Sequence, residues 1–122
     1  MIDHLGVTVS NFERSKAFYL AALAPVGYGP LMEYPGVLGM GDLVKKHPDL
    51  WLSQGAPIKI HVAIRAASRA QVDAFYAAAI AAGGTDNGAP GLRPQYHPGY
   101  YGAFVLDPDG NNLEAVCHDP NG

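Results

Sequence analysis

Two histidines in this sequence recur with the same surroundings. His4 lies in the alternating run 2–9 and His61 in the alternating run 58–65, and His61 follows His4 by 57 residues. Each run leads into a segment that carries Ala-Phe-Tyr, and Phe75 follows Phe18 by the same 57 residues. A fixed offset that holds through a strand and a helix indicates an internal repeat. Two copies related by a pseudo-twofold axis would bring the two histidines together near that axis.

One acid could complete a site with these histidines. Glu114 is the single charged residue in the otherwise apolar run 113–116. Burying an isolated carboxylate costs several kcal/mol unless a charge or a metal ion compensates it. Two imidazoles and one carboxylate with open positions suit Fe(II), and Mn(II), Ni(II) and Zn(II) are also possible. We therefore expect His4, His61 and Glu114 to bind one divalent metal.

The first half of the chain must position His4. Leu5, Val7 and Val9 alternate with more polar residues, which predicts a strand over 2–9 with one apolar face. Ser10 and Glu13 form a capping box, so a helix is expected over about 11–24. Turn residues divide the following segment, 28–54, into three predicted short strands.

The second half repeats this order. The strand 58–65 precedes a second capping box at Ser68 and Gln71, and a helix is expected to run to about residue 82. Residues 85–99 are rich in glycine and proline and are expected to form a long loop, with room for a short strand. Two further strands are predicted over 100–106 and 112–118, joined by a tight turn at 107–110.

Length and charge limit the possible functions. The chain has 122 residues, a net charge of −3 and a single cysteine, Cys117. This is one domain's worth of sequence without an internal disulfide, which fits the cytoplasm. No run is long and apolar enough to span a membrane, and no signal peptide is recognisable. Basic residues are scattered, which argues against nucleic acid or a membrane surface as the main partner.

A loop near the end of the chain carries many groups suited to substrate binding. Arg93 could clamp a carboxylate or phosphate, and His97 or a tyrosine could act as an acid or base near the metal. The tyrosines of this segment are candidates for substrate contacts: Tyr96, Tyr100 and Tyr101. The alternative is that these side chains brace the mouth of the cavity.

Three motifs together resemble the vicinal oxygen chelate superfamily, which includes glyoxalase I, extradiol dioxygenases and bleomycin-resistance proteins. They are the segment 2–7, the segment 13–19 and the run Asp-Pro-Asp-Gly-Asn-Asn-Leu-Glu over 107–114. The resemblance implies an α+β fold of two βαβββ modules, which form one open, curled, mixed β-barrel with the helices outside. Module one would span about residues 1–55 and module two about 56–122, within a single domain. In this family the ligands come from the first and last strands of each module, which matches His4, His61 and Glu114.

The last strand of the first module departs from the glyoxalase pattern. Alignment of the two halves places Trp51 opposite Glu114, and tryptophan is not a metal ligand. Three protein ligands resemble the extradiol dioxygenases more than glyoxalase I. Trp51 is then expected to line the cavity, as a wall for an apolar or aromatic substrate, and the alternative is that it only fills the barrel.

Two functions remain open from the sequence. The first is a metal-dependent lyase or dioxygenase, in which one divalent metal binds two neighbouring oxygens of a small-molecule substrate, with Glu114 and His97 as catalytic residues. The second is a bleomycin-resistance type of protein, which binds a small molecule without a catalytic metal. The resemblance also implies a homodimer, because the family often pairs modules across subunits.

Overall fold

The computed structural model describes all residues from 1 to 122. Two helices and eight strands follow each other in two matching series, with a short 3-10 helix, η1, after the first helix. The first series is β1 (Leu5–Val9), α1 (Phe12–Leu23), η1 (Ala24–Val26), β2 (Tyr28–Tyr34), β3 (Val37–Asp42) and β4 (Leu50–Gln54). The second is β5 (His61–Arg65), α2 (Arg69–Ala81), β6 (Thr85–Leu92), β7 (Tyr101–Leu106) and β8 (Asn112–Cys117).

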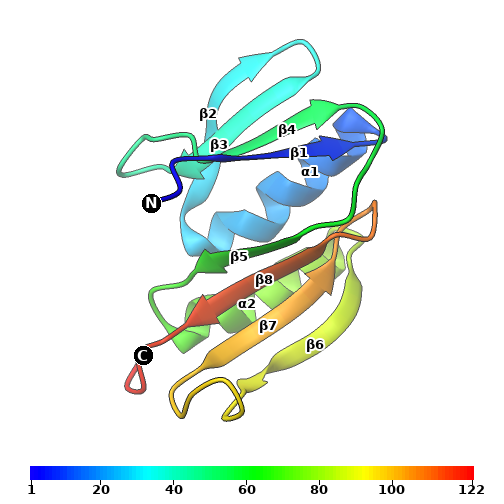
Figure 1. Ribbon diagram of the computed structural model, residues 1–122. Helices are drawn as coiled ribbons and strands as arrows, with labels where there is room; N and C mark the ends of the chain where they lie inside the picture. Colours follow the sequence, from blue (N-terminus) through cyan, green and yellow to red (C-terminus); the bar gives the residue numbers. More distant parts are fainter.

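Each series forms one four-stranded mixed sheet. The strand orders are β1-β4-β3-β2 and β5-β8-β7-β6, so the two sheets have the same topology. The first strand pairs in parallel with the last in each module, and the other pairings are antiparallel. The two sheets lie one after the other, with β1 and β5 as their inner edges (Figure 1). The predicted α+β fold of two βαβββ modules in an open, curled arrangement is confirmed.

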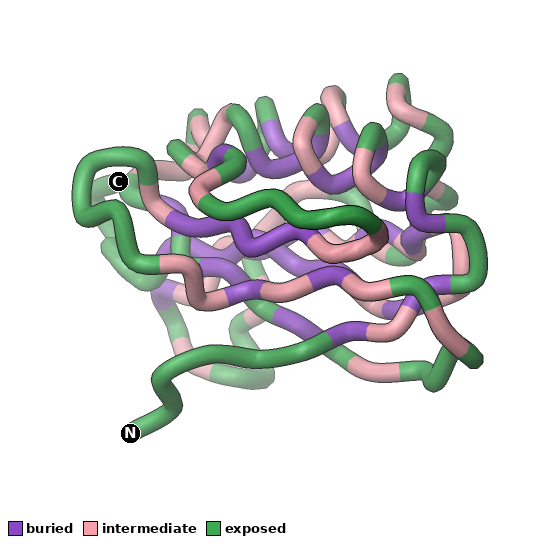
Figure 2. Tube along the Cα trace, turned by 90° about the horizontal axis from the view of Figure 1, so that it is seen from above, coloured by how far each residue is buried: buried purple, intermediate pink, exposed green.

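The helices cover one face of the sheets and leave the other face free. Buried residues concentrate between the helices and the strands (Figure 2). The α1 and α2 helices also contact each other, so both modules share one hydrophobic core. Side chains from both helices fill this core, and Cys117 is buried in it, as expected for a packed thiol. Because strand side chains alternate between faces, every second residue of β1, β4, β5 and β8 points to the free side.

The predicted capping box of Ser10 and Glu13 is wrong, although the predicted helix is present as α1. Asn11 caps α1, and its side chain accepts a hydrogen bond from the backbone N–H of Arg14. Ser10 instead donates its hydroxyl to Asp109 in the other module. At the second helix Ser68 caps α2 as expected and accepts from the backbone of Gln71.

The glycine- and proline-rich segment is more regular than the sequence predicts. Residues 85–92 form the full strand β6, and the loop is limited to residues 93–100. Pairing with β7 shifts register on both sides of Gly88, so irregular residues are accommodated as bulges. Proline is tolerated because β6 lies at the edge of its sheet. The first strand of each module is shorter than predicted, since regular pairing begins at Leu5 and His61.

A buried carboxylate ties the two modules together. Asp107, which is 4% exposed, follows β7 and accepts a hydrogen bond from the hydroxyl of Tyr19 in α1 at 2.5 Å. It also accepts from the Asn111 side chain at 2.8 Å and from the backbone N–H groups of Asp109 and Asn111. The turn between β7 and β8 is therefore fixed to the helix of the first module.

The repeat supplies a matched pair of tyrosines that tests this contact. Replacing Tyr19 by phenylalanine should lower the free energy of unfolding by about 1–3 kcal/mol, because the buried carboxylate loses a donor. Tyr76 occupies the equivalent position in α2, and its hydroxyl reaches the exposed Asp86. The Tyr76→Phe variant should leave stability almost unchanged. Urea unfolding measures the free energy of unfolding of both variants. An equal decrease in the two would show that the buried contact of Tyr19 stabilises the protein no more than the exposed contact of Tyr76.

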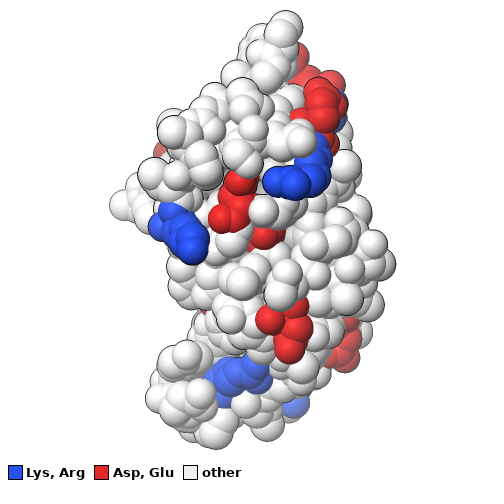
Figure 3. All heavy atoms as spheres, turned by 90° about the vertical axis from the view of Figure 1, so that its right-hand side faces the viewer, with Lys and Arg blue, Asp and Glu red and all other residues white.

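One face of the molecule, drawn in Figure 3, carries no patch of like charges. Acidic and basic side chains are interspersed on the face drawn in Figure 3. Neither helix of the structure is long and apolar enough to cross a membrane.

Candidate functional site

Glu114 is the most unusual side chain on the free face of the second sheet. It lies in β8 between Leu113 and Ala115, which point into the core, so its carboxylate points to the opposite side. Only 1% of the residue is exposed. One carboxylate oxygen lies 2.8 Å from Nε2 of His61, and the other accepts a short hydrogen bond from the hydroxyl of Tyr100. Both oxygens of this buried acid are thus engaged by protein groups.

The strand register explains how these groups meet. Glu114 pairs with Ala63 on β5, two residues after His61, and with Phe104 on β7. Phe104 therefore projects on the same side as Glu114 and covers it from the neighbouring strand. A cavity of about 350 Å³ is lined by Glu114 and four neighbours: His61, Tyr96, Tyr100 and Phe104. Its mouth is open at His61, whose side chain is 53% exposed.

Tyr100 is held as a hydrogen-bond donor in this site. Partial burial is the first cause that raises the pKa of its hydroxyl, and the hydrogen bond to Glu114 with the negative charge of that residue raises the pKa further. The phenol therefore stays protonated at any physiological pH. Tyr100 therefore donates to one oxygen of the carboxylate, while the exposed His61 lies against the other oxygen.

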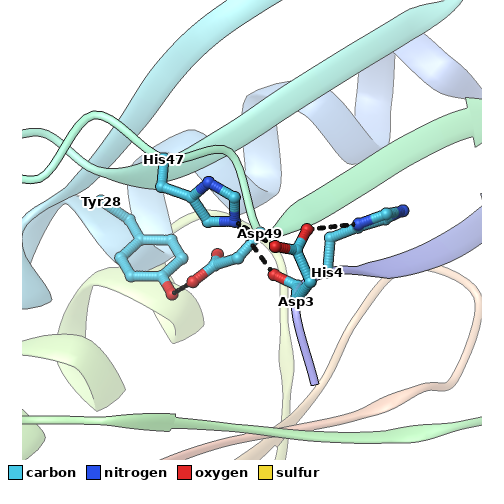
Figure 4. A network of polar contacts seen from close by, with 5 residues as sticks. All are labelled: Asp3, His4, Tyr28, His47 and Asp49. Carbon is cyan, nitrogen blue, oxygen red and sulfur yellow. Dashed lines mark hydrogen bonds and ion pairs between the residues drawn. The ribbon is translucent and has the colours of Figure 1, made fainter. Parts of the chain in front are cut away.

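His4 lies apart from the Glu114 carboxylate. Its Nδ1 atom is 2.8 Å from the carboxylate of Asp3, and its side chain is 58% exposed (Figure 4). His4 and His61 both line a second cavity, of about 360 Å³, between the two modules. Within one chain, however, no three histidine, cysteine or acidic side chains are grouped closely enough to hold a metal ion. The fold thus joins two of the three predicted ligands, His61 and Glu114.

Trp51 occupies the position in the first sheet that Glu114 has in the second. Trp51 pairs with Gly6 and Gly39, as Glu114 pairs with Ala63 and Phe104. The indole lies directly over Gly39, where an added Cβ would come within 2.7–2.9 Å of three ring carbons. In the first module the bulky residue is Trp51 and its neighbour on the next strand is Gly39. At the equivalent positions of the second module, Glu114 has the bulky neighbour Phe104. Trp51 lines neither of the two cavities that His61 borders.

The glycines on either side of Trp51 allow its position to be tested. Gly39→Ala should displace the indole and shift the emission maximum of Trp51, the single tryptophan of the chain. Gly6→Ala is the control, because a Cβ at Gly6 meets nothing within 4 Å. An unchanged spectrum in the Gly39 variant would show that the indole does not rest on this glycine.

Three further predicted residues, Arg93, His97 and Tyr101, do not line the Glu114 cavity. Arg93 stacks on Phe104, with 5.4 Å from its guanidinium carbon to the ring centre, and donates to the carbonyl of Ala89. This is the bracing role that the sequence left as an alternative. His97 lies outside the Glu114 cavity, with its Nε2 atom 2.9 Å from Nδ1 of His118. Tyr101 points to the other side of β7, where its hydroxyl donates to Asp73 of α2.

Sequence reasoning missed Phe104 as a member of the site. Nothing in the run 101–106 marks this residue, because Phe104 looks like any other apolar strand position. Its role depends on which residue of β8 it faces. The predicted turn at 107–110 would have placed Phe104 opposite Leu113, whereas the observed pairing of Leu106 with Asn112 places it opposite Glu114. The sequence therefore carried no signal for this contact.

Comparison with known families agrees with this architecture. The sequence-family model of the glyoxalase/bleomycin resistance protein/dioxygenase superfamily matches residues 1–115. The chain belongs to this superfamily. No curated protein sequence matches the chain.

Solved structures give the same result at the level of the fold. A glyoxalase/bleomycin resistance protein from Albidiferax ferrireducens is 32% identical with a TM-score of 0.82, over 94% of this chain and 97% of that one. A family enzyme from Burkholderia phytofirmans is 19% identical with a TM-score of 0.74, over 97% and 98% of the two chains. A lactoylglutathione lyase from Agrobacterium tumefaciens, also 19% identical, has a TM-score of 0.69 over 96% and 92%. The last two support the fold alone.

Proposed function

We propose that this vicinal oxygen chelate protein is a metal-dependent enzyme, of the lyase or dioxygenase type, that acts on a small molecule. The observation that carries the proposal is the pairing of His61 with a fully buried carboxylate at Glu114. A buried carboxylate next to a histidine at the wall of a cavity is a common arrangement of functional sites and is costly as a purely structural one.

The donor groups fit a divalent metal. Two ligands of one ion, each about 2.0–2.2 Å from it and at right angles, are about 3 Å apart. Nε2 of His61 and the nearer oxygen of Glu114 are separated by 2.8 Å. A nitrogen and an oxygen donor suit Fe, Mn, Ni or Zn. His61 and Glu114 would hold such an ion, which would act as a Lewis acid for charge that develops on substrate oxygens.

The side chains around Glu114 orient its carboxylate and shape the cavity for the substrate. Tyr100 holds the carboxylate in one orientation, and the rings of Tyr96 and Phe104 limit the access of water. A cavity of about 350 Å³ with aromatic walls suits a small, partly apolar molecule. His97, whose ring packs against Tyr100 outside the cavity, is the candidate acid or base for proton transfer.

The third ligand is proposed to come from a second copy of the chain. His4 is exposed and bound to Asp3, away from the carboxylate of Glu114. The free face of the first sheet carries Trp51 and the exposed apolar residues Met32 and Tyr34. A homodimer that covers this face would protect apolar surface and could place His4 of one copy beside His61 and Glu114 of the other.

Mixing two defective variants tests this arrangement. His4→Ala and Glu114→Gln should each lose most of the metal found in the protein after purification without chelators or nickel columns. Refolding them together in equal amounts should restore about a quarter of the wild-type metal content, since half the dimers are mixed and each holds one intact site. If the mixture contains no more metal than the separate variants, His4 does not act across subunits.

A second function is favoured by a specific observation. Both oxygens of Glu114 already have protein donors, and Trp51 stands where a fourth ligand would be in the repeat. This arrangement also fits a bleomycin-resistance type of protein that binds a small molecule without metal. Wild-type protein that carries less than a tenth of an equivalent of any transition metal and binds none on titration would put this second function first.

A further inference from the structure

Arg93 carries a positive charge that no acidic side chain of the protein neutralises. Its backbone N–H donates to the carbonyl of Tyr100, so Arg93 continues the pairing of β6 with β7. The guanidinium lies over the ring of Phe104, with 5.4 Å from its central carbon to the ring centre. No ion pair of the structure includes Arg93. Its charge is therefore available to a ligand.

The strand order places this charge in line with Glu114. The second sheet has the order β6, β7, β8, β5 (Figure 1). Gly88 of β6 pairs with Phe104, and Phe104 pairs with Glu114. Phe104 projects from the free face and lines the Glu114 cavity, so a ligand that covers its ring lies between β6 and β8.

Two glycines leave the space that the guanidinium fills. A Cβ at Gly91 would lie 3.2 Å from Nη1 of Arg93, and a Cβ at Gly88 would lie 3.2 Å from Nη2. The side chain of Arg93 thus runs back along β6 on the free face and ends next to Phe104. The guanidinium and the carboxylate of Glu114 belong to the strands on either side of this ring.

The bracing contacts of Arg93 leave donors free. An arginine has five N–H donors, and the recorded contacts of the side chain are with the carbonyls of Ala89 at 2.8 Å and Leu92 at 3.5 Å. The other donors have no acceptor in the protein. Burial and the hydrogen bond to Glu114 raise the pKa of Tyr100, and the positive charge of Arg93 acts in the opposite direction. The field of the guanidinium thus reaches a hydroxyl at the cavity wall.

We propose that the small molecule bound in the Glu114 cavity is a carboxylate, whose anionic group Arg93 binds. The inference names the substrate class and rests on the proposed function for the reaction itself. A planar guanidinium that is already held in place suits a carboxylate, and the rings of Tyr96 and Phe104 suit an apolar body. Both oxygens of Glu114 are engaged by His61 and Tyr100, so the two negative groups have separate partners.

Phenylacetate is a suitable probe, and phenylacetamide is its neutral counterpart of similar shape. Titration of the chelator-treated protein, followed by its nitrogen-proton spectrum, should show about tenfold tighter binding of phenylacetate, because the charged group gains hydrogen bonds to Arg93. The backbone amides of Tyr100 and Phe104 should shift. Equal affinity for the two probes, no binding of either, or shifts confined to the cleft between β1 and β5 would overturn the proposal.

A matched pair of arginine variants locates the anionic group. Arg93→Gln should weaken phenylacetate alone, so that the two probes bind within about twofold of each other. Arg65→Gln is the control and should keep the preference, because Arg65 lies in β5 of the same sheet and borders another cavity. A disturbed loop in Arg93→Gln would weaken both probes equally. That result, or a preference that persists in this variant, would overturn the proposal.

These titrations need no metal, so their outcome is independent of the metal site. A protein that binds no metal but prefers phenylacetate through Arg93 would contradict the metalloenzyme and keep the carboxylate ligand. A protein that binds metal through His61 and Glu114 but does not distinguish the two probes would keep the metalloenzyme and overturn the carboxylate ligand.

Discussion

Replacing Glu114 by glutamine should reduce the affinity for a divalent metal by more than about a hundredfold, while the fold remains intact. Loss of a supporting group behind a metal ligand commonly costs 10- to 100-fold in affinity, and loss of a charged ligand is expected to exceed this. Glutamine has the same shape and can still bond to His61 and Tyr100, so the buried position remains satisfied. Titration of the chelator-treated variant with Mn(II) or Zn(II), followed by calorimetry, measures the effect.

Two comparisons make this prediction specific. Glu33→Gln removes an exposed carboxylate that pairs with Lys16 in the first module, and it should leave metal affinity unchanged. Tyr100→Phe should weaken metal binding by about 10- to 100-fold, because the carboxylate loses the group that orients it. If Glu114→Gln binds metal as well as the wild type does, the metalloenzyme loses its main support and the metal-free binding protein becomes the better explanation.

Replacing Asp107 by alanine should lower the free energy of unfolding by about 3–5 kcal/mol. The carboxylate accepts four hydrogen bonds, and its removal leaves the buried hydroxyl of Tyr19 and the Asn111 side chain without an acceptor. Charge-assisted hydrogen bonds contribute about 1.5–3 kcal/mol each, and orphaned buried donors add to the loss. Urea unfolding, monitored by the fluorescence of Trp51, measures the change.

The neighbouring acid provides the control for Asp107. Asp109 makes the other contact of this turn with the first module, through the hydroxyl and the backbone N–H of Ser10 on the surface. Asp109→Ala should cost less than about 1 kcal/mol, since exposed polar contacts contribute little. A loss of similar size in both variants would mean that burial does not distinguish them.

The sequence alone was sufficient for the features that depend on local periodicity. The 57-residue offset between His4 and His61 predicted two equivalent modules, and the strand orders of the two sheets are the same. Alternation along 112–118 placed Glu114 on the face opposite Cys117, because strand side chains alternate whatever the strand pairs with. The alignment of Trp51 with Glu114 agrees with the observed register, since both pair with equivalent residues of the first strand.

Only the tertiary structure decided which groups meet across strands and modules. Tyr100 and Phe104 reach Glu114 because the hairpin register and the loop 93–100 bring them there, and neither is a local property of the sequence. Ser10 does not cap α1, because its hydroxyl donates a hydrogen bond to the carboxylate of Asp109, 99 residues away. The strand β6 exists because β7 supplies hydrogen-bond partners that outweigh the weak strand propensity of residues 85–92. His4 precedes the first residue of β1, whereas His61 is the first residue of β5. His4 therefore contacts Asp3 and not Glu114, although the two histidines occupy equivalent positions in the repeat.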